Sequence, residues 1–254
     1  MTWMTLLGEL GLGLLLGWLG GIFGIGGGLM AIPALVGLFA MDQALAQGTA
    51  LVMIAPNVLL GFWRYRQHNP IDIRSACLLG SCSIVSTYVL AKVAANLDMH
   101  TMRLMFAAFL LALSVYMAWG LRPRTLASVA APRITLSKAW LPALGLVSGV
   151  FSGLFTVGGG LVVAPALIKW FGVPKQTMAQ GLALATVTPG AVVALATYAQ
   201  AGKVDWAVGL PLAVGGMLSM TLGVALAHRL PERLLRALFC VLMGITGVVM
   251  LLKP

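Results

Sequence analysis

The chain has 254 residues, of which 60% are hydrophobic and only 9% are charged, and its formal net charge is +10. A soluble domain carries about 25% charged residues, so this composition excludes a water-soluble globular fold and indicates an integral membrane protein. The basic residues lie mainly between apolar segments. That distribution is typical of loops facing the cytoplasm and anionic lipid, and argues against a nucleic-acid-binding surface.

Apolar runs without Asp, Glu, Lys or Arg predict the membrane segments. They are Leu10–Met41, Gln43–Trp63, Ser75–Ala91, Leu104–Leu121, Ala139–Ile168, Gln176–Gly202, Trp206–Ala227 and Ala237–Leu252. These runs are continuous and lack the period-two alternation of a membrane barrel, so they predict helices. Because a spanning helix needs about 20 residues, the two longest runs, Leu10–Met41 and Ala139–Ile168, are too long for one crossing and too short for two.

Each of the two longest runs contains three consecutive glycines. Gly26, Gly27 and Gly28 match Gly158, Gly159 and Gly160 at an offset of 132 positions (158 − 26). Glycine in a helix interior costs about 1 kcal/mol relative to alanine, so each triplet predicts a broken helix, either a re-entrant pair or two short crossings. A broken backbone is tolerated at membrane depth only inside protein or along a wet cavity. Such breaks in matching halves point to a transporter's binding site.

Six other glycines recur at every fourth position, again in matching places: Gly13, Gly17, Gly21, Gly145, Gly149 and Gly153. This spacing is typical of close helix packing. We therefore interpret these six glycines as packing residues and not as ligands.

The remainder of the two halves matches at an offset of 133. The matches include Gln47 with Gln180, Pro56 with Pro189, Tyr65 with Tyr198, Asp72 with Asp205 and Arg103 with Arg236. The chain is therefore predicted to be a duplication, with a first transmembrane repeat at 1–120, a cytoplasmic linker at 121–138 and a second transmembrane repeat at 139–254. The Lys and Arg distribution places matched loops on opposite sides and both termini in the periplasm of a bacterial inner membrane. The predicted fold class is thus all-α, with two inverted repeats and about 8–10 membrane segments.

The six acidic residues all lie near segment ends. Cation transporters usually hold a carboxylate at membrane depth, and catalysis would need groups that cannot be assembled there. We therefore expect no enzymatic activity, no metal and no cofactor. The remaining deep groups are neutral, and helix N-termini with amide and hydroxyl donors suit an anion.

The candidate substrate-binding residues, expected to form one central site, are Gly26, Gly27, Gly28, Gln47, Thr49, Asn57, Gly158, Gly159, Gly160, Gln180, Thr186 and Thr188. For Thr186 and Thr188, a hydrogen bond to their own helix backbone is an equal alternative. Tyr65 and Tyr198 are the candidate gates.

Several motifs carry a family resemblance. The pattern G-x-G-G-G-x-x-x-x-P begins at Gly24, R-Y-R-x-x-x-P-I-D begins at Arg64, and H-R-L-P-E-R-L-L-R begins at His228. The chain thereby resembles the TauE/SafE family of sulfite and organosulfonate exporters. The resemblance implies a secondary transporter that exports small anions such as sulfite, organosulfonates or carboxylates by alternating access. An anion-selective channel or an uptake permease on the same scaffold is the alternative. The expected partners are the small anion substrate and the lipid bilayer, and no nucleic acid is expected. The oligomeric state is left open, and a homodimer is one of the possibilities.

Overall fold

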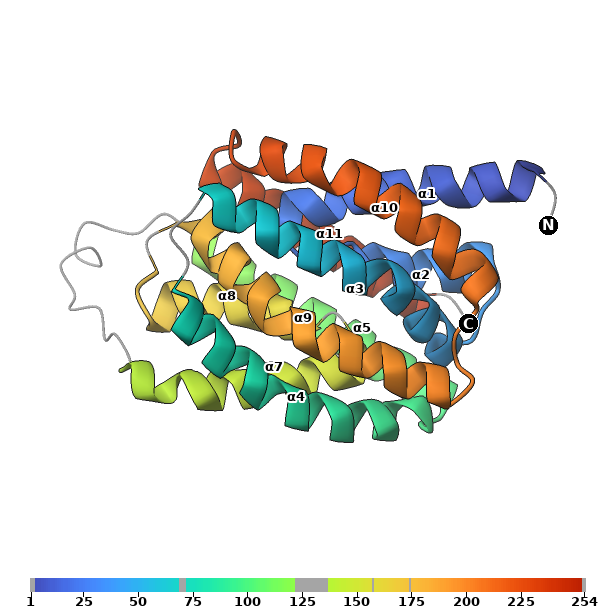
Figure 1. The fold of residues 1–254 in the computed structure, drawn as a ribbon, viewed down its shortest axis with the longest axis horizontal. Coiled ribbons are helices and arrows are strands. Elements are labelled where there is room, and N and C mark those ends of the chain that lie inside the picture. The colour runs from blue at the N-terminus through green and yellow to red at the C-terminus, as the bar shows by residue number, and fades with distance from the viewer. Residues whose placement is uncertain (1–2, 69–71, 122–136, 157, 174, 253–254) are drawn as a thin grey trace.

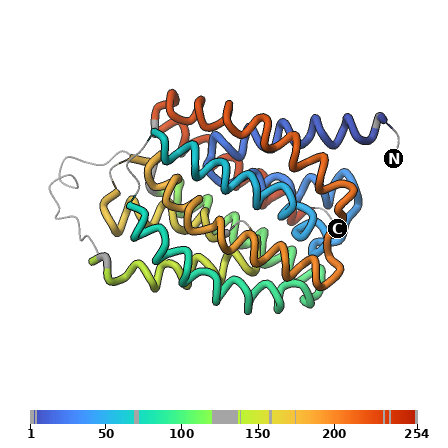
Figure 2. The backbone as a smooth tube through the Cα atoms, in the orientation of Figure 1, coloured from blue at the N-terminus to red at the C-terminus, as the bar shows by residue number. Residues whose placement is uncertain are grey.

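The computed structural model describes residues 3–68, 72–121, 137–156, 158–173 and 175–252, and within them the chain is helical with no strand (Figures 1 and 2). The helices are α1 (Trp3–Phe23), α2 (Gly28–Leu38), α3 (Gln43–His68), α4 (Ile73–Ala95), α5 (Met99–Leu121), η1 (Lys138–Trp140), α7 (Leu141–Phe155), α8 (Gly158–Trp170), α9 (Gln176–Gln200), α10 (Trp206–Ala227) and α11 (Glu232–Leu252). In the described residues, seven helices are long and apolar enough to span a membrane, while α2, α7 and α8 are apolar but shorter. The predicted multi-pass helical fold is confirmed.

The distribution of side chains is that of a protein in lipid. Large apolar residues such as Leu218, Leu222 and Ile245 are well exposed on the outer faces of α10 and α11. Polar residues such as Gln47 and Asn57 are fully buried inside the bundle. Because hydrocarbon solvates apolar surface and cannot satisfy polar groups, this arrangement matches the bilayer as the solvent.

The two long helices α3 and α9 pack against each other in antiparallel orientation at the centre of the bundle. Helix α10 packs on α1 and α3, and α4 packs on α7 and α9. Figure 1 shows α1 beside α10 along one edge and α7 beside α4 along the opposite edge. The first helix of each half therefore packs mainly on a helix of the other half.

The glycines that recur at every fourth position in α1 and α7 form the contacts with α10 and α4. A Cβ at Gly17 would clash with the backbone of Gly216 in α10, and one at Gly149 would clash with the carbonyl of Ser83 in α4. Gly13, Gly21, Gly145 and Gly153 make similar backbone approaches. Such contacts bring helix backbones close enough for dispersion attraction to hold them together in lipid. The predicted packing role of these glycines is confirmed.

The first long run bends between α1 and α2. Gly24, Gly26 and Gly27 have φ angles of 66°, 71° and 90°, a conformation that side chains disfavour. The turn folds α2 back on α1, so that a Cβ at Gly20 would clash with the backbone of Gly27.

The second long run bends earlier than expected. Helix α7 ends at Phe155, Thr156 takes a left-handed conformation with φ 59°, and α8 begins at Gly158. The triplet Gly158–Gly160 therefore forms the first turn of α8, and the expectation that the helix breaks at the triplet itself is wrong here. Glycine is tolerated in a first turn because the N–H groups there have no intrahelical partner to lose. Of the predicted linker 121–138, residues 122–136 lie outside the described residues, so the repeat boundaries stay a prediction.

Candidate functional site

Three polar side chains satisfy the carbonyl groups exposed where α1 ends. The Tyr65 hydroxyl donates to the Gly21 carbonyl at 3.0 Å, and Gln180 Nε2 donates to the Phe23 carbonyl at 2.9 Å. A little further along, Asn57 Nδ2 donates to the Gly26 carbonyl at 3.3 Å. The last four carbonyls of a helix lack intrahelical partners, and lipid cannot supply them. Gln180 and Asn57, expected as substrate ligands, thus hold the first bend in place.

Two tyrosine–glutamine pairs join α3 to α9. The Tyr65 hydroxyl lies 3.1 Å from Gln180 Oε1, and the Tyr198 hydroxyl donates to Gln47 Oε1 at 2.6 Å. Both tyrosines are fully buried. Each pair takes its tyrosine from one half and its glutamine from the other, in sequence-matched positions.

These two pairs lie at opposite ends of the central helices. Gln47 and Tyr65 are separated by 18 positions on α3 (65 − 47), which is about 27 Å at 1.5 Å per residue. Since Tyr65 contacts Gln180, the expectation that Gln47 and Gln180 share one central site is wrong. The reason is geometric: antiparallel helices bring matched residues together only near their crossing point, and both glutamines lie near helix ends.

The three candidate threonines already have structural partners. Thr49 Oγ1 accepts the N–H of Asp205 at 2.9 Å. Thr186 and Thr188 donate to the carbonyls four residues earlier in α9, at 2.9 and 2.7 Å. The alternative considered for Thr186 and Thr188, a bond to their own backbone, is the one observed.

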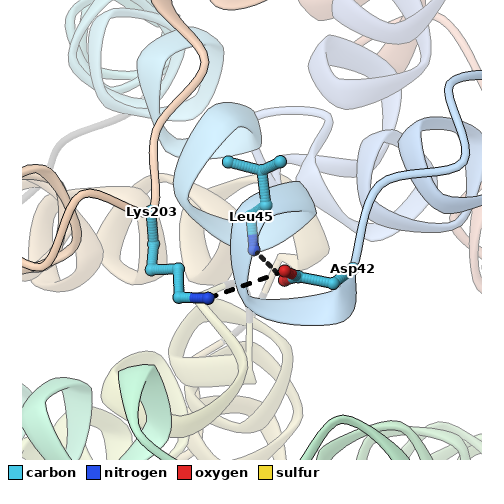
Figure 3. Close-up of polar contacts among 3 residues, drawn as sticks. All are labelled: Asp42, Leu45 and Lys203. Atoms are coloured by element: carbon cyan, nitrogen blue, oxygen red, sulfur yellow. Dashed lines mark hydrogen bonds and ion pairs between the residues drawn. The ribbon is translucent and has the colours of Figure 1, made fainter.

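The loop between α9 and α10 closes over the start of α3. Lys203 Nζ lies 3.6 Å from Asp42 Oδ2, and Asp42 Oδ1 accepts the N–H of Leu45 at 2.7 Å (Figure 3). The Lys203 carbonyl packs directly on Gly48, where a Cβ would collide with it. The end of the helix pair that contains Gln47 and Tyr198 is therefore covered by backbone and an ion pair.

The two glycine triplets lie against their own halves. A Cβ on Gly27 would lie 2.7 Å from the Leu16 carbonyl of α1 and 3.0 Å from the Met53 side chain of α3. A Cβ on Gly159 would lie 2.7 Å from the Ser148 carbonyl of α7. Helix α2 packs on α3, and α8 packs on α9 and α7. Each bend thus lies beside the long helix of its own half.

Several buried donors were missed by the sequence reasoning. Gln43 is fully buried with neither amide atom bonded, and Gln47 Nε2 is also without a partner within the described part of the chain. Gln43 matches Gln176 at the offset of 133 and lies one turn before Gln47, a signal that could have found it. The hydroxyls of Ser148 and Ser152 are also buried, and neither has a partner among the residues that the structure describes. They have no polar counterpart in the first half, so comparing the repeats concealed them.

The opposite end of the helix pair carries basic and aromatic side chains. A hollow of about 300 Å³ there is lined by Trp63, Arg66 and Gln67. The Arg64 guanidinium lies 5.0 Å from the Trp63 ring centre. These positive charges flank the Tyr65–Gln180 pair at the C-terminal end of α3.

Within the described residues, seven membrane-length helices, a first bend held by buried polar side chains and a central antiparallel helix pair define a multi-pass membrane protein. The chain belongs to the sulfite exporter TauE/SafE family, whose model matches residues 10–250. A protein of Methanocaldococcus jannaschii is 26% identical over 94% of this chain and 93% of its own length. A protein of Xylella fastidiosa is 27% identical over 90% of this chain and 87% of its own length. A protein of Bacillus subtilis is 24% identical over 87% of this chain and 88% of its own length. All three are named "probable membrane transporter protein". No solved structure matches the chain.

Proposed function

We propose that this protein is a secondary transporter that exports small anions, such as sulfite, organosulfonates or related carboxylates, by alternating access. The observation that carries the proposal is the pair of reciprocal tyrosine–glutamine contacts at opposite ends of α3 and α9. An alternating-access carrier needs two closures, one toward each side of the membrane, on one shared scaffold. The family description and the names of the relatives support transport as the general activity.

The inverted arrangement of the two halves forms part of the proposal. Its support is that the matched helices α3 and α9 run antiparallel, as do α5 and α11, where Arg103 bonds the Met250 carbonyl and Ser114 bonds the Cys240 carbonyl. Matched helices of opposite direction are what inverted repeats require. On this basis both termini are periplasmic, and the arginine-rich end of α3 faces the cytoplasm of the inner membrane.

In this scheme Tyr65–Gln180 is the cytoplasmic closure and Tyr198–Gln47 is the periplasmic closure. Arg64 and Arg66 attract anions to the cytoplasmic mouth. Separation of Tyr65 from Gln180 admits the anion, and rocking of one half against the other then closes this end and parts Tyr198 from Gln47. Both closures use a tyrosine–glutamine contact, and an anion that binds one open state more tightly than the other shifts the balance between them.

The anionic character of the substrate rests on the donors available inside the bundle. The first N–H groups of α2 and α8 carry the positive end of each helix dipole, and Gln43 and Gln47 hold amide N–H groups without partners in the described chain. Asp42 precedes Gln43 in the sequence, and its carboxylate accepts the Leu45 N–H and lies 3.6 Å from Lys203 Nζ. The helix dipoles repel a cation, whereas an anion gains hydrogen bonds from these N–H groups.

The test is sulfite flux in proteoliposomes containing the purified protein, with protein-free vesicles as the blank. Saturable counterflow of labelled sulfite, accelerated by unlabelled sulfite on the opposite side, is the expected result. Steady conductance without counterflow would replace the carrier with the anion-selective channel, and flux only in the inward direction would replace export with uptake. Absence of movement of sulfite, a sulfonate and acetate would refute anion transport.

A further inference from the structure

The second bend is surrounded by hydroxyl groups that the first bend lacks. Ser83 and Thr87 come from α4, Ser148 and Ser152 from α7, and none is more than 1% exposed. The residues matched to these four, which lie around the first bend, are Gly216 and Met220 of α10 and Leu16 and Gly20 of α1. Both halves pack the same helices in the same way, so packing alone does not require these four hydroxyls.

The absence of a side chain at position 190 brings α9 close to the hydroxyls. Gly190 of α9 occupies the position matched by Asn57 in the first half. A Cβ built on Gly190 would lie 3.1 Å from Thr87 Oγ1, 3.5 Å from Ser152 Oγ and 3.7 Å from Ser83 Oγ. Three oxygens from two helices therefore surround one point beside α9. In the first half, the Asn57 side chain fills the corresponding place and bonds the Gly26 carbonyl.

The four hydroxyls differ in what their protons do. The Ser83 hydroxyl lies 3.0 Å from the Gly80 carbonyl and 3.1 Å from the Thr186 carbonyl, and Thr87 donates to the Gly149 carbonyl at 3.2 Å. Because these two protons are already used, the two oxygens are left to act as acceptors. Ser148 and Ser152 have no partner in the described structure, so both protons are free to donate. A buried hydroxyl without a partner is costly, and two together indicate that something else binds there.

The first turn of α8 completes the donor set. A Cβ at Gly159 would lie 2.8 Å from Ser148 Oγ, so the absence of a side chain brings this hydroxyl close to the start of the helix. The first N–H groups of a helix have no partner within the helix, and the helix dipole favours negative charge there. Free donors beside a helix N-terminus suit an anion better than a cation.

We infer that Ser148, Ser152 and the first turn of α8 bind a small singly charged oxyanion. The oxygens of Ser83 and Thr87 accept hydrogen bonds from the proton that the anion keeps. This inference rests on the proposed function and places the substrate at the second bend only. Hydrogen sulfite has the required combination of one charge and one proton. A dianion such as sulfate carries no proton for the two acceptors and pays a larger desolvation cost in a buried site.

The test is thermal unfolding of the purified protein in lipid nanodiscs, titrated with sodium sulfite without oxygen, sodium sulfate or sodium gluconate. Sulfite should raise the melting temperature of the wild-type protein at lower concentration than sulfate, and gluconate should not raise it. Ser148→Ala and Ser152→Ala should each weaken sulfite binding by about tenfold or more, the effect of losing a hydrogen bond to a charged group. Neither change should lower the melting temperature without anion, because each removes an unpaired hydroxyl.

Two variants separate ligand binding from packing. Ser86→Ala, at the same α4–α7 contact, removes a hydroxyl already bonded to the Leu146 carbonyl at 2.9 Å, and sulfite affinity should stay at the wild-type value. Gly190→Ala keeps every hydroxyl but puts a methyl group 3.1 Å from Thr87 Oγ1 and 3.5 Å from Ser152 Oγ, and it should weaken sulfite binding.

Sulfite stabilisation that is unchanged in Ser148→Ala, Ser152→Ala and Gly190→Ala would refute the site while leaving anion transport intact. Stabilisation by sodium over N-methylglucamine that disappears in these variants would make it a cation site and overturn the inference. Absence of anion binding and of sulfite flux in the wild-type protein would refute the proposed function as well.

Discussion

Removing one tyrosine hydroxyl should open one end of the α3–α9 pair and not the other. Tyr198→Phe removes the 2.6 Å bond to Gln47 and leaves Gln47 Oε1 without its donor. Loss of a partner by a buried polar group costs about 1–3 kcal/mol, which would raise the open population at that end by about 5- to 150-fold. Tyr65→Phe should act similarly at the opposite end, where the lost hydroxyl faces the Gly21 carbonyl and Gln180 Oε1.

Thiol labelling measures this opening. Ala50 and Ala183 are matched, fully buried residues that lie three positions further into their helices than Gln47 and Gln180. Ala50→Cys and Ala183→Cys are introduced after the three native cysteines are replaced by alanine. An impermeant maleimide is then applied to sealed vesicles of each orientation. Tyr198→Phe should increase labelling at position 50 from the periplasmic side only, and Tyr65→Phe at position 183 from the cytoplasmic side only.

Tyr116→Phe is the matched control. Its hydroxyl is buried in α5 with no partner in the described residues, so removing it should leave both labelling rates unchanged. Equal labelling from both sides in either closure variant, or rates indistinguishable from those of the parent protein, would refute the two-closure reasoning.

Three further outcomes follow from the packing and the loops. Gln67→Cys and Gln200→Cys, at matched and exposed positions, should label from opposite sides of the membrane; labelling from the same side would exclude inverted repeats. Gly17→Val and Gly149→Val should each destabilise the folded protein by about 3 kcal/mol or more, because the added atoms would meet helix backbone. The measurement is the melting temperature. Gly8→Ala, where nothing lies within 4 Å of the added Cβ, is the neutral control, and an equal drop in its melting temperature would contradict the argument. Asp42→Ala should lower the stability of the folded protein by about 1 kcal/mol, because it removes the hydrogen bond from the Leu45 N–H. Lys203→Ala should lower it by under about 0.5 kcal/mol, because the ion pair is partly exposed. A lower melting temperature for Lys203→Ala than for Asp42→Ala would show that the ion pair holds the loop.

Sequence reasoning recovered the helical fold well, because composition and run length leave few alternatives in a membrane. The recurrence of glycine at every fourth position, in matching places of the two halves, predicted close helix packing. Gly17 and Gly149 make such close contacts. The place of the second bend was missed because it depends on the left-handed backbone of Thr156, a conformation that threonine seldom adopts.

The site was predicted less well, and for a physical reason. Grouping Gln47 with Gln180 treated matched residues as neighbours, although the antiparallel helices α3 and α9 bring matched residues together only near their crossing point. The antiparallel packing instead pairs Gln47 with Tyr198 and Tyr65 with Gln180. The hydroxyls of Ser148 and Ser152 lie in one half only, so no comparison between the halves could single them out; their significance depends on burial and missing partners, which only coordinates provide.

The exchange of first helices between the halves has a consequence for biosynthesis. Helix α1 finds its main partner only in α10, which begins 183 residues after α1 ends (206 − 23). At about 5–20 residues per second, the glycine face of α1 waits roughly 10 to 40 s in the bilayer or at the translocon before its partner is made. The first half therefore cannot mature alone, and a ribosome that stops before α10 leaves an unpaired small-residue surface open to capture by other membrane helices or by quality-control proteases. The protein can complete its fold only after α10 has inserted into the membrane.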